Sequence, residues 1–182
     1  MISILKENHQ VLVLDSNYRA NIYGLPLFTI VVVTRIGNTI LVTHCFMEWE
    51  REPYFIWALK VLRNLYDEFR IQEPNVVFHD RDRVCINALE SVFPNVPKIL
   101  CSWHMKMDVE AWMMRVFGYD EDELSRKAIL NPVGQQAMKF FCSIIKSSTE
   151  REYLSAHLRL ERQAKCSENI AWKDFVEYLD SQ

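Results

Sequence analysis

The sequence is poor in glycine and lacks the short motifs that bind nucleotides or carry common hydrolytic sites. Only four glycines occur in 182 residues, and no GxxxxGK(S/T) loop, GxGxxG fingerprint, GxSxG elbow or HExxH helix is present. These motifs depend on glycine turns or on fixed side-chain spacings. Nucleotide-binding, serine-hydrolase and HExxH metalloprotease functions therefore have no support in the sequence.

Disulfide patterning and long apolar runs are also missing. The five cysteines are odd in number, form no CxxC pair and lie mostly within apolar stretches, which favours a reducing compartment, the cytosol or the nucleus. The first ten residues, MISILKENHQ, do not resemble a secretory signal, and no apolar stretch reaches the length of a membrane span. Secretion and membrane insertion are not expected.

The sequence has no excess of positive charge. The sequence contains 21 Lys and Arg residues and 24 Asp and Glu residues, which gives a net charge of −3. The charge of the whole chain therefore does not indicate nucleic-acid binding. With 49% hydrophobic and 25% charged residues, the composition is that of a globular protein, and the length suits one domain with an extension.

The first third of the chain contains three segments of strand character. They are rich in β-branched and other apolar residues and cover Val11–Asp15, Leu27–Arg35 and Asn38–Phe46. The last two segments meet at Ile36-Gly37-Asn38, a turn of hairpin length. The sequence therefore predicts an antiparallel meander whose first strand ends at Asp15.

The next segments alternate between helix and strand. The apolar spacing predicts helices and short buried strands in this order: helix Tyr54–Phe69, strand Asn75–Asp80, helix Val84–Val92, strand Pro97–Cys101 and helix Trp103–Phe117. Three antiparallel strands followed by two parallel strands, with helices on the flanks, predict an α/β fold with the mixed sheet of RNase H-like proteins.

After residue 117 the chain is expected to be helical. The acidic run at residues 120–123 and the pair Asn131-Pro132 separate it from two predicted helices, Gln135–Ser147 and Glu150–Lys165. We therefore predict an RNase H-like core at residues 1–117 and a helical extension at residues 118–182.

Two aspartates at strand ends are the first candidates for chemistry. Asp15 ends the first predicted strand and Asp80 the fourth, and these strands lie side by side in the predicted sheet. Two such carboxylates suit Mg²⁺ or Mn²⁺, and paired metals roughly 3.5–4 Å apart promote phosphodiester displacement with help from a third carboxylate. Taken singly, each aspartate also suits a turn or a helix cap. Asp82 competes with Asp80, and spacing alone does not choose between them.

Cys101 and His104 stand three residues apart, a spacing that can place both on one metal. A zinc site needs two further ligands, and no partner pair is evident. From spacing alone, the better interpretation is a buried cysteine at a strand end and a polar histidine in the first turn of a helix.

Taken together, four segments between about Val11 and Val109 resemble the transposase domain of Mutator-like elements (MULE). The similarity lies in residues 14–27 (LDSNYRANIYGLPL), residues 50–59 (EREPYFIWAL), residues 79–82 (HDRD) leading into Ala88 and residues 92–94 (VFP), and residues 100–104 (LCSWH). Each segment alone is weak, but their order is specific.

The resemblance implies a DDE-type DNA transposase. Asp15 and Asp80 would be its first two acidic residues, and Cys101 and His104 the Cys-x-x-His element that follows. The resemblance also implies Mg²⁺ or Mn²⁺ as cofactor and DNA, at the transposon ends and at the target, as partner. It further implies a nuclear location and is compatible with a homo-oligomer. The third acidic residue would be Glu152, with Glu150 as runner-up, although both also suit the start of a helix.

The family's zinc-binding DNA-recognition region and long C-terminal region are not in this sequence, so recognition of element ends is expected to lie elsewhere. The alternative is a domesticated or degenerate fragment that serves as a non-catalytic, DNA-associated or interaction module in the nucleus; a nuclease of the same fold is a third reading. A DNA-binding module predicts a basic stripe drawn from Arg19, Arg35, Arg81, Arg83, Lys106 and Arg115.

Overall fold

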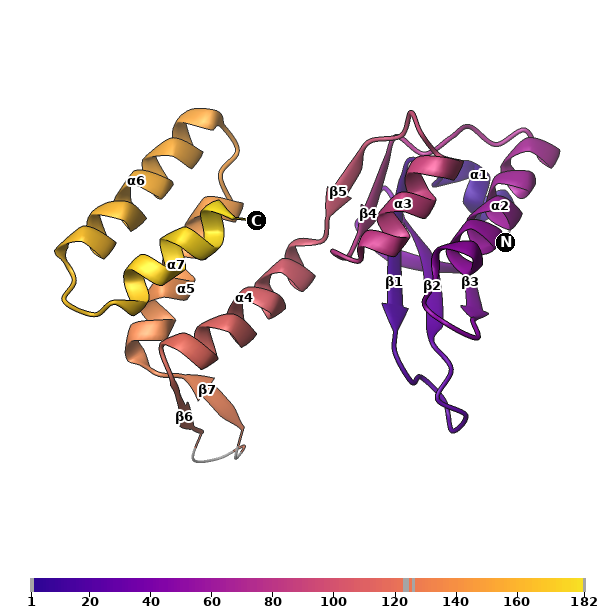
Figure 1. Ribbon diagram of the computed structural model, residues 1–182. Helices are drawn as coiled ribbons and strands as arrows, with labels where there is room; N and C mark the ends of the chain where they lie inside the picture. Colours follow the sequence, from indigo (N-terminus) through magenta and orange to yellow (C-terminus); the bar gives the residue numbers. More distant parts are fainter. Residues whose placement is uncertain (1, 123–124, 126, 182) are drawn as a thin grey trace. The chain divides into compact units, whose positions relative to one another are not determined.

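The computed structural model describes residues 2–122, 125 and 127–181. Its contacts divide the chain into two compact units, Met1–His104 and Met105–Gln182 (Figure 1). The sequence places the border between the core and the extension after residue 117, whereas the contacts place the division after His104. Which of the two marks the limit of an independently folding domain stays a prediction.

The first unit is built on a five-stranded sheet in the order β3-β2-β1-β4-β5 (Figure 1). The first three strands are antiparallel, whereas β4 and β5 run parallel to β1. The strands are β1 Val11–Asn17, β2 Leu27–Val33, β3 Thr39–Phe46, β4 Val76–His79 and β5 Lys98–Leu100. This order and these directions are those of an RNase H-like sheet and confirm the predicted fold class.

The turn between β2 and β3 has the predicted position. Gly37 has a positive φ of 82°, which glycine adopts without steric cost, and the Thr34 amide donates to the Asn38 carbonyl over 2.8 Å. The following strand is thereby held in register beside β2.

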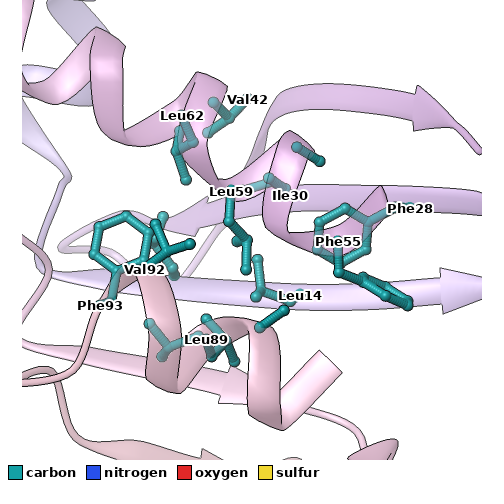
Figure 2. Packing of buried hydrophobic residues seen from close by; sticks show 14 of the residues in the cluster. Leu14, Phe28, Ile30, Val42, Phe55, Leu59, Leu62, Leu89, Val92 and Phe93 are labelled. Atoms are coloured by element: carbon teal, nitrogen blue, oxygen red, sulfur yellow. The ribbon is translucent and has the colours of Figure 1, made fainter. Parts of the chain in front are cut away.

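Helices cover one face of the sheet. The first unit contains α1 Ile2–Glu7, which the sequence did not suggest, α2 Glu52–Glu68 and α3 Arg83–Val92. Figure 2 shows side chains of α2 and α3 packed against strand residues, with Phe28 and Phe55 in edge-to-face contact at 5.0 Å. Leu12 and Leu14 of β1 are buried in this core, so the alternate residues of β1 point to the other face.

The second unit contains a small hairpin and three further helices. Helix α4, Ser102–Val116, begins in the first unit and continues into the second. The other elements are β6 Tyr119–Glu121, β7 Ala128–Leu130, α5 Pro132–Ile145, α6 Glu150–Cys166 and α7 Ala171–Asp180. Helices α5 and α6 confirm the two predicted helices, whereas the hairpin and α7 were not predicted. Part of the acidic run, residues 123 and 124, lies outside the described residues.

Buried aromatic residues form the core of the second unit. Trp172 of α7 makes edge-to-face contacts with Phe117 and with Phe140 of α5. Val109 and Met113 of α4 belong to the same cluster, so α4 contributes to this core along most of its length.

No helix among the described residues combines the length and the apolar character that crossing a membrane requires.

Candidate metal site for phosphoryl transfer

The register between β1 and β4 brings Asp15 and Asp80 together. Val13 pairs with Phe78 in the parallel ladder, and continuing this register by two residues places Asp15 beside Asp80. Leu14 and His79, one position earlier on each strand, are buried under the helices. Both aspartates therefore point to the opposite face of the sheet, at the edge where the parallel strands end.

His104 reaches the same edge from the start of α4. The Cys101 amide donates to the His79 carbonyl over 2.7 Å, which ties the end of β5 to the end of β4. Helix α4 then begins at Ser102, and His104 Nε2 lies 3.2 Å from Asp15 Oδ1. Because a carboxylate only accepts, Nε2 donates in this contact. The other nitrogen, Nδ1, is buried and has no partner among the described residues.

A second donor contacts Asp15. Asn17 Nδ2 donates to Asp15 Oδ2 over 2.9 Å, so each carboxylate oxygen accepts one hydrogen bond. An ionised carboxylate offers about four lone pairs, so Asp15 keeps capacity for a further ligand on each oxygen. Asn17 and His104 together fix the orientation of this carboxylate.

Asp80 and Asp82, which sequence spacing did not separate, have different surroundings. Asp80 Oδ1 accepts from the Asp82 amide over 3.1 Å. Asp82 Oδ1 accepts from the Val84 amide over 2.9 Å and caps α3. The geometry therefore favours Asp80 as the partner of Asp15, with Asp82 as the helix cap that holds the loop.

Burial raises the pKa of the Asp80 carboxyl above its ordinary value, and the charges of Asp82 and Asp15 raise it further. The hydrogen bond from the Asp82 backbone and the proximity of His104 lower this pKa in part. The ionised form of Asp80 is therefore destabilised by its partial burial and by the neighbouring negative charges. A cation bound beside Asp80 would offset this electrostatic cost.

The donor set fits a hard divalent cation. Asp15 and Asp80 offer carboxylate oxygens, which Mg²⁺ and Mn²⁺ prefer. Among residues 2–122, 125 and 127–181 no three His, Cys, Asp or Glu side chains converge on one point, so further ligands would come from water, from substrate or from a third acidic residue. His104 contacts Asp15, which makes it a neighbour of the candidate metal ligands.

The candidates for the third acidic residue lie in the second unit, at the start of α6. Thr149 caps this helix through a 3.2 Å hydrogen bond from the Glu152 amide, and Glu152 Oε2 accepts from the Ser148 amide over 2.8 Å. The Glu152 carboxylate is therefore engaged at the start of the helix, where it accepts from the residue that precedes the N-cap. Glu150, in the first turn, is exposed.

Residues 11–108, more than half of the chain, match the MULE transposase domain family. The chain belongs to this family. The match contains Asp15, Asp80, Cys101 and His104 and ends before the second unit's hairpin.

Two curated proteins are similar to this MULE domain. The PKS-NRPS hybrid synthetase cheA of Chaetomium globosum is 29% identical over 111 residues, which are 61% of this chain and 2% of that protein. Protein FAR1-RELATED SEQUENCE 5 of Arabidopsis thaliana is 28% identical over 103 residues, 57% of this chain and 13% of that protein. The chain therefore spans only a small part of these relatives.

A solved structure, the catalytic domain of Mos1 mariner transposase, covers 97% of this chain and 87% of its own, with 12% identity and a TM-score of 0.36. That score is too low to support a fold assignment. The RNase H-like fold of the MULE domain rests on its strand order.

Replacing Asp80 by asparagine is expected to stabilise the MULE domain in metal-free buffer at pH 7, with a rise in Tm of about 2–4 °C. The raised pKa means that the folded chain holds this proton more tightly than the unfolded chain, so stability falls as pH rises from the ordinary Asp value through the raised one. Asparagine keeps the acceptor for the Asp82 amide and removes the charge.

Thermal unfolding monitored by circular dichroism checks this expectation. The advantage of Asp80→Asn should shrink as pH falls and disappear below about pH 3, where the carboxyl is protonated in both the folded and the unfolded state. Glu90→Gln, at an exposed position of α3, serves as the control and should leave Tm unchanged at both pH values. A lower Tm for Asp80→Asn at pH 7 would contradict the electrostatic description of the site.

Proposed function

We propose that this MULE domain is the catalytic domain of a DDE-type DNA transposase, which cleaves and joins DNA phosphodiesters with the help of divalent metal ions. The observation that carries the proposal is the pair Asp15 and Asp80 at the carboxyl ends of neighbouring parallel strands, with His104 held against Asp15 at 3.2 Å. Two facing carboxylates on rigid strands are what an oxygen-only metal site requires.

The residues of the site have separate roles. Asp15 and Asp80 would hold Mg²⁺ or Mn²⁺, which, when bound, activate the attacking oxygen and stabilise the leaving oxygen of an in-line displacement. His104 and Asn17 orient Asp15 by donating to its two oxygens. Asp82 caps α3 and thereby fixes the loop that carries Asp80.

Glu152 is proposed as the third acidic residue, with Glu150 as the alternative. Glu152 is an exposed carboxylate whose local hydrogen bond uses only one of its oxygens, Oε2. The substrate would be DNA at transposon ends and at target sites, which implies a nuclear location, and further segments of a longer protein would recognise the element ends.

The test is nicking and strand transfer on a labelled DNA duplex, with Mg²⁺, with Mn²⁺ and with EDTA. We expect product only with metal, and a loss of about a hundredfold or more in Glu152→Gln, because removing one metal-binding charge costs several kcal/mol in the transition state. Glutamine still accepts from the Ser148 amide, so this variant keeps the start of α6 intact.

Glu150→Gln is the matched control, because it removes the same charge two residues away and should retain activity. The reverse result would assign the third acidic role to Glu150. No metal-dependent product from a chain whose fold is confirmed by circular dichroism would contradict the proposal and favour a non-catalytic module.

A further inference from the structure

A groove between α5 and α6 in the second unit is lined by positive charges and hydroxyl groups. Its cations are Lys139 of α5, Lys146 at the end of α5, and Arg151 and Arg159 of α6. Its hydroxyls belong to Ser143, Ser147, Thr149 and Ser155. All of these residues lie within one unit, so the groove depends on the packing of α5 against α6 alone.

Helical spacing explains how the groove forms. On α6, residues 151, 155 and 159 are four apart and share one face of the helix, and Arg162 continues this stripe. On α5, residues 139 and 143 are also four apart, and residue 147 follows just past the helix end. Because α5 packs on α6, the two stripes border the same groove.

The groove is basic although the chain as a whole is acidic. A hollow on α6 adjoins the groove and adds Arg162 and Glu150 to its lining. The groove and the hollow together contain five cations and two acids, Glu150 and Glu152. This local excess of three positive charges occurs in a chain whose net charge is −3. None of the five cations forms an ion pair with another described residue. Elsewhere on the unit, by contrast, Lys165 pairs with Glu161 at 3.4 Å.

We infer that this groove binds the sugar–phosphate backbone of duplex DNA, without reading base sequence. Arginine, lysine and hydroxyl side chains are the groups that contact phosphate oxygens, and unpaired cations are free to do so. The choice of DNA rests on the proposed function. Glu152 lines the same groove, so a strand held there lies next to the proposed third carboxylate.

An acidic protein or a second copy of the chain is the competing partner. Leu154 and Leu158 of α6 are half exposed and line the adjoining hollow with Arg151 and Arg162. The groove between α5 and α6 itself is lined mainly by charged and hydroxyl side chains, and the unpaired cations lie there, which favours a polyanion over an apolar helix face.

The experiment measures binding of a fluorescein-labelled random-sequence duplex to the full chain by anisotropy, in EDTA and across a range of salt concentrations. The double variant Arg151→Gln/Arg159→Gln is expected to bind about tenfold more weakly, and the slope of log affinity against log salt should become shallower by about 2, because two phosphate contacts are lost. The matched control, Lys165→Gln/Lys173→Gln, removes the same charge from the side of the unit formed by α6 and α7 and should bind like the unmodified chain.

The measurement separates this inference from the proposed catalytic function. Binding in EDTA involves no cleavage, and Asp80→Asn should bind DNA at least as tightly as the unmodified chain. Groove-dependent binding without metal-dependent nicking would leave the inference standing and refute only catalysis. The inference would be overturned if Arg151→Gln/Arg159→Gln and Lys165→Gln/Lys173→Gln weakened DNA binding equally, or if the folded chain did not bind DNA at low salt. It would also be overturned if the chain self-associated and either Arg151→Gln/Arg159→Gln or Leu154→Ser/Leu158→Ser abolished this self-association without changing the affinity for DNA.

Discussion

Asp15→Asn and Asp80→Asn should each lower metal-dependent nicking and strand transfer by about a thousandfold or more. Each substitution replaces a charged metal ligand by a neutral one, and metal-borne stabilisation of the transition state is worth several kcal/mol, about 1.4 kcal/mol for each factor of ten. Asparagine keeps the shape of both side chains and one acceptor oxygen. At position 80 this oxygen still accepts from the Asp82 amide, whereas at position 15 it can serve only one of the two donors, His104 or Asn17. Initial rates on a labelled duplex at saturating Mg²⁺ measure the effect.

Asp82→Asn is the matched control for Asp80→Asn. Asparagine caps helices about as well as aspartate, so α3 should keep its start and the rate should stay within about threefold of that of the unmodified chain. Because Asp80→Asn is expected to raise Tm, its inactivity could not be attributed to unfolding. If Asp82→Asn were inactive and Asp80→Asn active, the second acidic role would belong to Asp82.

The two aspartates could be predicted from the sequence because strand ends are local features. Each aspartate closes an apolar run that is visible in the sequence, and the order of elements makes the two strands neighbours. In the structure β1 continues past Asp15 to Asn17, and β4 ends at His79, one residue before Asp80. The contact between His104 and Asp15 could not be predicted, because it depends on how α4 leaves β5. The different surroundings of Asp80 and Asp82 also required the loop conformation.

The basic groove was missed for a related reason. The spacing of Arg151, Arg159 and Arg162 along α6 is visible in the sequence, but Lys139 and Lys146 join them only through the packing of α5. The six basic residues suggested by the sequence, Arg19, Arg35, Arg81, Arg83, Lys106 and Arg115, are exposed and are not part of this groove.

Two of the missed elements are short strands with a weak sequence signal, whereas a third, α7, has a clear one. The strands β6 and β7 have three residues each, and acidic residues in and after β6 have low strand propensity. Helix α7 had a readable pattern, because Trp172, Phe175 and Val176 recur at three and four residues. What the sequence did not reveal is that α7 closes a separate core.

Trp172→Ala should destabilise the second unit by about 3–5 kcal/mol, the usual cost of removing a large buried aromatic side chain. Trp172 is only 2% exposed and loses its contacts with Phe117 and Phe140 in this variant. Since a domain of this size has about 5–15 kcal/mol of stability, much of the unit's margin disappears. Hydrogen–deuterium exchange measured by mass spectrometry should show faster exchange in α5, α6 and α7, while β1, β4 and α2 keep their protection.

Trp57→Ala is the control, because Trp57 on α2 is 59% exposed and its loss should change stability by less than about 0.5 kcal/mol. The exchange of residues 109–117 then decides where the folding border lies. Val109 and Met113 pack in the second core, so peptides of this stretch should lose protection together with α7, which places the border near residue 104 and not after residue 117. Uniform loss of protection across both units would mean that the chain unfolds as one cooperative body.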